Sequence, residues 1–173
     1  MLILGVDCGI TGGIAALTED GVFMDVHDLP IMVHGKGKWV DGVELLKMVR
    51  DMRQGQPARA MVERIHAMPA MGAVANNSKG MTLGSTLATL QIAGCAIELV
   101  EPGIWKRALG LLAPNSSDRE KKHASLCRAR QLFPMAPLTR IADSGRAEAL
   151  LIAHYTQRFR QGEVQPRQQE LVA

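Results

Sequence analysis

Four acidic side chains interrupt segments of this sequence that are otherwise apolar. Asp7 ends the β-prone run LILGVDC directly before the glycine-rich GITGG, and Glu63 interrupts the apolar run MVERI. Asp143 and Glu148 lie in IADSGRAEALLIAHY, just before and within a segment of helical periodicity. A carboxylate in such surroundings needs a cation or hydrogen-bond donors, because an isolated buried charge is strongly unfavourable.

One chemistry accounts for these four acids together. Buried carboxylates repel one another unless divalent cations neutralise them. Mg²⁺ prefers oxygen ligands and keeps water molecules that a substrate phosphate can replace. Two such ions about 3.5 to 4 Å apart can activate a water and stabilise the leaving 3′ oxygen of a phosphodiester. The acids therefore predict a metal-dependent phosphodiester hydrolase that needs no protein nucleophile.

Each acid also has a simpler interpretation when it is taken alone. An Asp before a Gly, such as Asp7, is ordinary turn chemistry. Asp143 and Glu148 suit the N-terminal end of a helix, where Asp143 could cap together with Ser144. The histidines lack the HxH or HExxH spacing of a zinc site and stay unassigned: His66, His123 and His154. Three widely spaced cysteines predict buried free thiols: Cys8, Cys95 and Cys127.

The elements that must position the acids follow from hydrophobic period and turn residues. Three strands joined by short turns are expected over residues 2–8, 13–19 and 21–29, followed by strands over 58–66 and 96–102. Helical spacing predicts helices over about 41–53, 81–94, 118–132 and 144–160. This order indicates an α/β protein with a mixed five-stranded sheet flanked by helices, which is typical of a ribonuclease H-like fold.

The bulk properties set limits on the class of protein. A chain of 173 residues fits one domain, which we place at residues 1–160 with a polar C-terminal tail at 161–173. The net charge of +3 permits a polyanionic partner without revealing one. No basic leader precedes the first strand and no apolar stretch has bilayer length, so a cytoplasmic protein without a membrane partner is expected.

Four motifs give the sequence a specific resemblance. GVDCGITGG, MVERIHAMP, EPGIWKRALG and SGRAEALLIAHY, in this order and spacing, resemble a RuvC-like Holliday junction resolvase, especially the bacteriophage-type branch, over about residues 2–155. The resemblance implies that Asp7 and Glu63 are metal ligands and that Glu148 takes the place of the last catalytic acid. The family usually has an acid or histidine three residues before that acid, where this chain has Gly145, which leaves Asp143 as the candidate fourth ligand.

The resemblance also assigns two lysines and a loop. It places basic residues of the family at Lys106 and Lys122, which would contact phosphate or stabilise charge in the transition state; the alternative is that both are solvated helix lysines. Residues 67–80 fill the place of a mobile loop that enters the junction. Met68 and Met71 could act there as apolar wedges, although packing onto the core is the favoured interpretation.

The resemblance implies a Mg²⁺-dependent, structure-selective endodeoxyribonuclease with two metal ions, for which Mn²⁺ would substitute. Its substrate would be branched DNA, as four-way junctions, forks or flaps, cut by paired incisions from a homodimer. The helix over 81–94, with Leu83, Leu87, Leu90 and Ile92, is the candidate dimer contact, and packing on its own sheet is the alternative. Two other functions stay open: a non-catalytic junction-binding module, and an actin-like or sugar-kinase phosphotransferase suggested by DCGITGG, for which the chain is short.

Overall fold

The computed structural model describes residues 1–35, 37–68, 70–112 and 116–160, so the predicted tail at 161–173 lies outside the described residues. Five strands form one sheet in the order β3-β2-β1-β6-β7. Their bounds are β1 Leu2–Asp7, β2 Gly13–Thr18, β3 Phe23–Asp28, β6 Ala58–Glu63 and β7 Ala96–Val100. The first three strands pair antiparallel, whereas β6 runs parallel to β1 and β7 parallel to β6. The predicted mixed five-stranded sheet is therefore confirmed.

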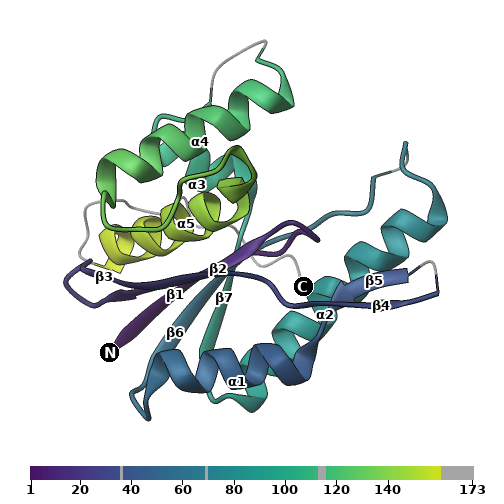
Figure 1. Cartoon of the computed structure of the whole chain (residues 1–173), viewed down its shortest axis with the longest axis horizontal. Coiled ribbons are helices and arrows are strands. Elements are labelled where there is room, and N and C mark those ends of the chain that lie inside the picture. Colours follow the sequence, from purple (N-terminus) through teal and green to yellow (C-terminus); the bar gives the residue numbers. More distant parts are fainter. Residues whose placement is uncertain (36, 69, 113–115, 161–173) are drawn as a thin grey trace, which may run out of the picture.

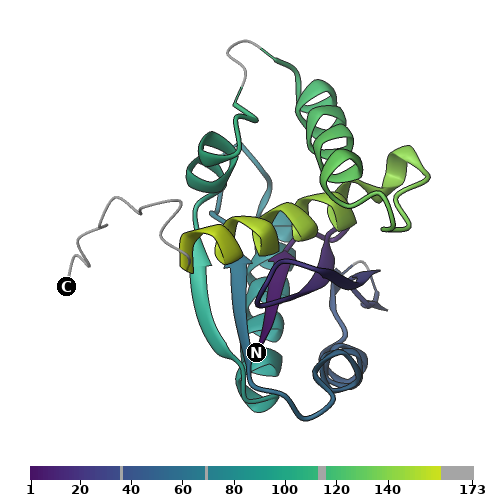
Figure 2. The same ribbon diagram turned by 90° about the vertical axis from the view of Figure 1, so that its left-hand side faces the viewer.

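Helices cover both faces of this sheet, as Figures 1 and 2 show. On one face lie α3 Pro102–Ala108, α4 Asp118–Leu132 and α5 Ser144–Arg160, and on the other lie α1 Gly42–Arg53 and α2 Ala73–Ile92. The strand β1 is apolar up to Asp7, as expected for a strand buried on both sides: Ile3 enters the core under α5, while Leu4 and Val6 enter the core over α1 and α2.

Local sequence explains where the predicted helices begin. The Asp41 carboxylate accepts hydrogen bonds from the backbone N–H groups of Val43 and Glu44 at the start of α1. Ser117 and Glu120 form a reciprocal capping box at the start of α4. The helices predicted over 41–53, 118–132 and 144–160 are confirmed, and the short helix α3 lies within the motif EPGIWKRALG.

Two segments differ from the prediction. Residues expected to have no regular structure form a hairpin of β4 Ile31–His34 and β5 Gly37–Val40, which packs beside α2. The helix expected over 81–94 begins at Ala73 and ends at Ile92, so the predicted 67–80 loop extends only to residue 72. The run AVANNSKG has no apolar period that would reveal a helix, and its Asn76 side chain instead ties the first turn to the backbone of Met68 and Met71.

The α2 face proposed for dimerisation is partly used within the chain. Leu90 is buried, and Leu83 and Leu87 pack against the same core, whereas Ile92 is exposed. This supports the alternative that the helix packs on its own sheet. Cys8 and Cys95 are buried as predicted, but Cys127 is only half-buried, so that prediction was wrong for one thiol. Within the described part of the chain, no helix is both long and apolar enough to cross a bilayer.

The helix α5 approaches β1 more closely than side chains normally allow. A Cβ atom on Gly5 would lie 2.2 Å from the carbonyl oxygen of Ala149 and 2.3 Å from the backbone nitrogen of Ala153. Only glycine can occupy this point of β1 without moving the helix. The contact therefore brings the backbone of α5 directly onto the strand that ends in Asp7.

Candidate metal centre and cleft

Three of the predicted acids meet at one edge of the sheet. Val6 of β1 pairs with Val62 of β6 in a parallel register, so the residues that follow, Asp7 and Glu63, end neighbouring strands at the same edge. Glu148 joins them from the second turn of α5. One carboxylate oxygen from each of the three acids lies within 4.8 Å of the others. A metal ion could therefore be bound by all three.

The electrostatics of this cluster favour a cation. Desolvation, and then the charges of Glu63 and Glu148, raise the pKa of Asp7 to about 8. Desolvation and the charge of Glu148 also raise the pKa of Glu63. Without a cation, the three groups cannot all be ionised at neutral pH at low cost. The donors are all carboxylate oxygens, which suit hard ions such as Mg²⁺ or Mn²⁺, so the residues present fit the predicted metal.

The short helix α3 supplies two groups that hold the carboxylates. The indole N–H of Trp105 donates to Glu63 Oε1 at 2.9 Å, and the Lys106 ammonium donates to Glu148 Oε1 at 2.9 Å. Trp105 belongs to the core, since the residue is 0% exposed. Its bond to Glu63 was not predicted, although a buried indole N–H normally requires an acceptor and Glu63 was already a candidate ligand.

A serine of α4 gives Glu148 a further donor. The Ser125 hydroxyl is buried and donates to Glu148 Oε1 at 3.0 Å. This oxygen is therefore fixed between Lys106 and Ser125, from two different helices. Asp7 is held more weakly, by the backbone N–H of Gly9 at 3.3 Å. Each of the three carboxylates thus has a partner that orients it toward the common site.

The structure does not bring the predicted fourth ligand, Asp143, to this cluster. Asp143 is fully buried in the 3₁₀ turn η1 Ile141–Asp143, where its carboxylate accepts hydrogen bonds from the backbone N–H, Nε and Nη2 of Arg140 at 2.7 to 2.9 Å. Although desolvation opposes it, this bonding holds the pKa of Asp143 below its usual value. Asp143 is therefore a partner of Arg140 that secures the start of α5.

The resemblance implies an acid or a histidine at position 145, where this chain has a glycine. The neighbouring backbone leaves no room there for a side chain. A Cβ atom there would lie 2.1 Å from the carbonyl oxygen of Thr11 and 2.8 Å from the Cα atom of Gly12. The first turn of α5 is thus pressed against the turn between β1 and β2. No side chain can be accommodated at this position unless that backbone contact opens.

The acids open onto a cleft of about 760 Å³. Asp7 and Glu63 form one part of its wall. Another part of the wall is formed by three cationic side chains: Arg64, Lys79 and Lys122. The structure thus places the predicted Lys122 beside the acids, while Lys79 was missed because it lies in the part of α2 expected to be a loop.

The two methionines of the loop also line the cleft. Met68 is 51% exposed and Met71 is half-buried, and neither belongs to a core cluster. The expectation that they pack onto the core was therefore wrong. The reason is that Asn76 holds the backbone at Met68 and Met71 against the start of α2, which leaves these side chains beside the acids.

The histidines make contacts outside the cluster of acids. His66 Nε2 lies 2.6 Å from Glu101 Oε2, on the rim of the cleft. His123 lies 3.7 Å from the sulfur of Cys127, and the ring of His154 packs edge-on against Phe133. These contacts give structural explanations for residues that the sequence left unassigned.

Comparison with solved structures identifies the fold. The chain is similar to T. thermophilus RuvC in complex with a Holliday junction substrate, with a TM-score of 0.53, and to another Thermus thermophilus RuvC structure, with a TM-score of 0.52. In both cases the sequence identity is 18%, and the match covers 94% of this chain and 98% of the RuvC chain. Neither a protein-family model nor a curated protein sequence matches. The chain thus has a RuvC-like fold of the ribonuclease H-like type, as predicted.

Proposed function

We propose that this chain is a divalent-metal-dependent endonuclease that cuts phosphodiester bonds in branched DNA. The observation that carries the proposal is the cluster of Asp7, Glu63 and Glu148 at the edge of the sheet, within 4.8 Å of one another and beside a cleft lined with cations. Carboxylates alone would repel a nucleic acid, and cations alone would bind it without cutting. Together they provide a metal site next to a surface for phosphates.

The roles of the residues follow from their contacts. Asp7, Glu63 and Glu148 would hold the metal, which when bound would supply an activated water and neutralise charge on the phosphate. Trp105 fixes the rotamer of Glu63, and Lys106 and Ser125 fix that of Glu148, so the carboxylates do not need to reorganise. Lys79 and Lys122 stand in the cleft as mobile point charges for the phosphates on either side of the cut.

A four-way DNA junction is the proposed substrate among branched DNAs. Two observations support this choice: the likeness to RuvC, one of whose structures holds a Holliday junction substrate, and the exposed Met68 beside the acids. An apolar side chain in this place can enter between base steps that are already distorted at a branch point. Linear duplex DNA offers no such opening without the cost of unstacking.

The decisive experiment compares end-labelled substrates: a four-way junction, a fork, a flap and a linear duplex, each with Mg²⁺, Mn²⁺ or EDTA. The wild-type chain is expected to cut the junction only with metal and to leave a 5′ phosphate. Asp7→Asn and Glu63→Gln should abolish cleavage while binding is kept, because each removes metal-binding charge with little change in shape. Asp51→Asn is the matched control, since Asp51 is exposed on α1.

The other outcomes would replace the proposal. Retention of the junction without cleavage in either metal would indicate a non-catalytic binding module. Turnover of ATP without cleavage would indicate a phosphotransferase. Cleavage by Asp7→Asn at the wild-type rate would remove the acid cluster from the mechanism.

A homodimer is proposed as the active species. Paired incisions need two sites related by the two-fold symmetry of a junction, and one cluster of this size serves one strand. Of the residues on α2, Val74 and Ile92 are strongly exposed and Met81 is exposed, so they leave an apolar surface for such a contact. Sedimentation of the Asp7→Asn protein on a four-way junction should show two protomers per junction. One protomer per junction in the species that cuts would overturn this part.

A further inference from the structure

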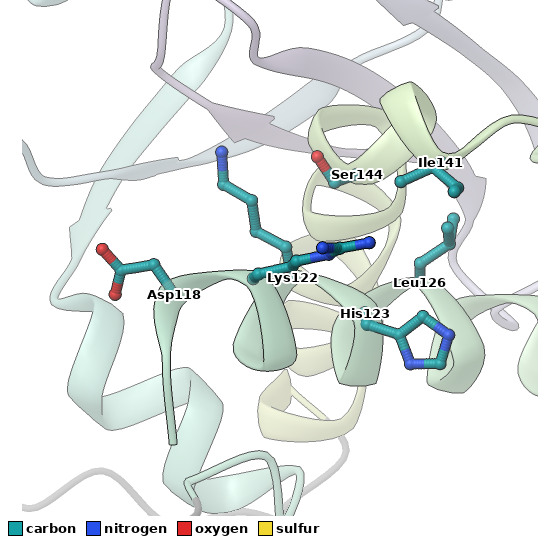
Figure 3. Close-up of a pocket in the computed structure, with 7 residues that line it drawn as sticks. Asp118, Lys122, His123, Leu126, Ile141 and Ser144 are labelled. Atoms are coloured by element: carbon teal, nitrogen blue, oxygen red, sulfur yellow. The ribbon is translucent and has the colours of Figure 1, made fainter. Parts of the chain in front are cut away.

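A second groove adjoins the cleft and has no role in the mechanism above. It has a volume of about 350 Å³ and lies between α4 and the η1 turn that leads into α5. Figure 3 shows Leu126 of α4 pointing toward Ile141, with Ser144 beside it and Asp118 at the far end of the helix. Arg119, Lys122 and His123 complete the lining. Lys122 also lines the acid cleft, so the groove and the cleft share this side chain.

Several cations around the groove are already neutralised by the protein. Lys121 pairs with Asp118 at 3.5 Å, Arg140 with Asp143 at 2.7 Å, and Arg146 with Asp28 at 2.6 Å. Arg119 and Lys122 differ, because neither has a carboxylate partner within residues 1–35, 37–68, 70–112 and 116–160. Both are exposed and spaced three residues apart on α4, so they project from neighbouring positions of one helix face. The groove therefore has uncompensated positive charge.

The floor of the groove is apolar. Leu126 is buried at its base, and Ile141 is 79% exposed at its edge. A nucleic-acid backbone alternates charged phosphates with sugars that have an apolar face. The groove suits such a backbone, because its cations can contact the phosphates and its apolar floor can contact the sugars. A small free anion would need the cations but not the isoleucine.

We infer that this groove holds the sugar–phosphate backbone of the nucleic-acid strand on one side of the cleavage point, with Arg119 and His123 contacting its phosphates. The inference rests on the proposed function and extends it, since Lys122 would contact the phosphate between the groove and the metal centre. The strand would leave the cleft over the outer face of α4 and cross toward Ile141. Arg119 is suited to this task because its planar guanidinium can contact two phosphate oxygens at once.

The test measures binding of a four-way junction in EDTA, where the proposed reaction cannot occur. Arg119→Ala should weaken binding by up to about fivefold, the size of one solvent-exposed ion pair. It should also reduce the magnitude of the slope of log K against log salt concentration by about 0.9, the value for one phosphate contact. Arg50→Ala is the matched control, because Arg50 is exposed on α1, on the opposite face of the sheet. Its affinity and salt slope should equal those of the wild-type protein.

Neutral methylphosphonates identify the contact directly. Each phosphate of the junction beside the cleavage point is replaced in turn by a methylphosphonate. At one of these positions, the replacement should weaken binding of the wild-type and Arg50→Ala proteins. The same substitution should have no further effect on Arg119→Ala, because the contact is already absent. Arg119→Lys should restore most of the salt slope, which a purely structural role of Arg119 would not produce.

If metal-dependent cleavage is found but Arg119→Ala keeps the wild-type salt slope, the groove does not hold the strand. If the wild-type protein neither binds nor cuts branched DNA, the proposed function fails first, and the inference fails with it.

Discussion

The hydrogen bond from Trp105 to Glu63 gives a sharp prediction about the metal centre. Trp105→Phe keeps an aromatic ring in the core but removes the N–H that donates to Glu63 Oε1 at 2.9 Å. A hydrogen bond to a charged group contributes about 1.5 to 3 kcal/mol, and the smaller ring leaves a cavity that costs about 1 kcal/mol more. We therefore expect a loss of about 2.5 to 4 kcal/mol in the free energy of unfolding.

The effect on metal binding separates positioning from packing. Loss of a group that orients a ligand typically weakens metal affinity 10- to 100-fold, so Trp105→Phe should weaken Mn²⁺ binding by about this factor in calorimetry without DNA. Trp39→Phe is the matched control, since Trp39 is half-buried on β5, away from the three acids. It should lose some stability and keep the wild-type affinity for Mn²⁺.

A double-mutant cycle completes this experiment. In a Glu63→Gln background the acceptor is neutral, so Trp105→Phe should cost less stability than it does in the wild-type protein. Equal costs in both backgrounds, together with unchanged Mn²⁺ affinity, would refute the reasoning. Trp105 would then be only a core residue.

Three further predictions follow from the same site. In EDTA, the contribution of Asp7 to the free energy of unfolding should fall by a few kcal/mol as the pH rises from about 4 to 8, because its folded pKa of about 8 lies above the unfolded value of about 3.9. In urea titrations, the stability of Asp7→Asn relative to wild type should therefore increase over this range, and a constant difference would contradict the prediction. Gly145→Asp should destabilise the fold by about 3 kcal/mol or more rather than supply a fourth ligand, because its Cβ would meet the Thr11 carbonyl at 2.1 Å; unchanged stability in urea would show that α5 can move away from that turn. Ser125→Ala should weaken Mn²⁺ binding in calorimetry with little loss of stability, because it removes one of the two donors that orient Glu148. An unchanged affinity would show that Lys106 alone orients this carboxylate.

Much of the fold could be predicted because its elements carry strong local signals. The strands that became β1 and β2 are apolar up to their last residue, and β6 contains the apolar run AMV, as expected for strands buried on both faces. The β4–β5 hairpin was missed because its strands are short and largely exposed, and because the sequence between them is rich in Gly and Lys. The first two turns of α2 were missed because their residues have low helix propensity and depend on contacts made by the folded chain.

The site was predictable only where a residue contradicts its own surroundings. Asp7 and Glu63 are acids within apolar strands, and that conflict is visible in the sequence. Asp143 is also an acid in apolar surroundings, but its carboxylate accepts hydrogen bonds from Arg140. No spacing in the sequence distinguishes such an acid from a candidate metal ligand. Trp105 and Ser125 could not be assigned, since their roles depend on which carboxylate the fold places within reach.

The close backbone contact between α5 and β1 has a consequence for how the site moves. The Gly5 contact leaves no layer of side chains between the elements that carry Asp7 and Glu148, so these two acids can separate only when the core itself opens. Lys106, Lys122 and Ser125 lie on α3 and α4, which pack onto that core through their side chains. Amide hydrogen exchange should therefore be slowest in β1 and the middle of α5, and faster in α3 and α4. The proposed metal ligands would then form a fixed frame, while the proposed phosphate contacts on α4 can open and close by local unfolding on a shorter timescale.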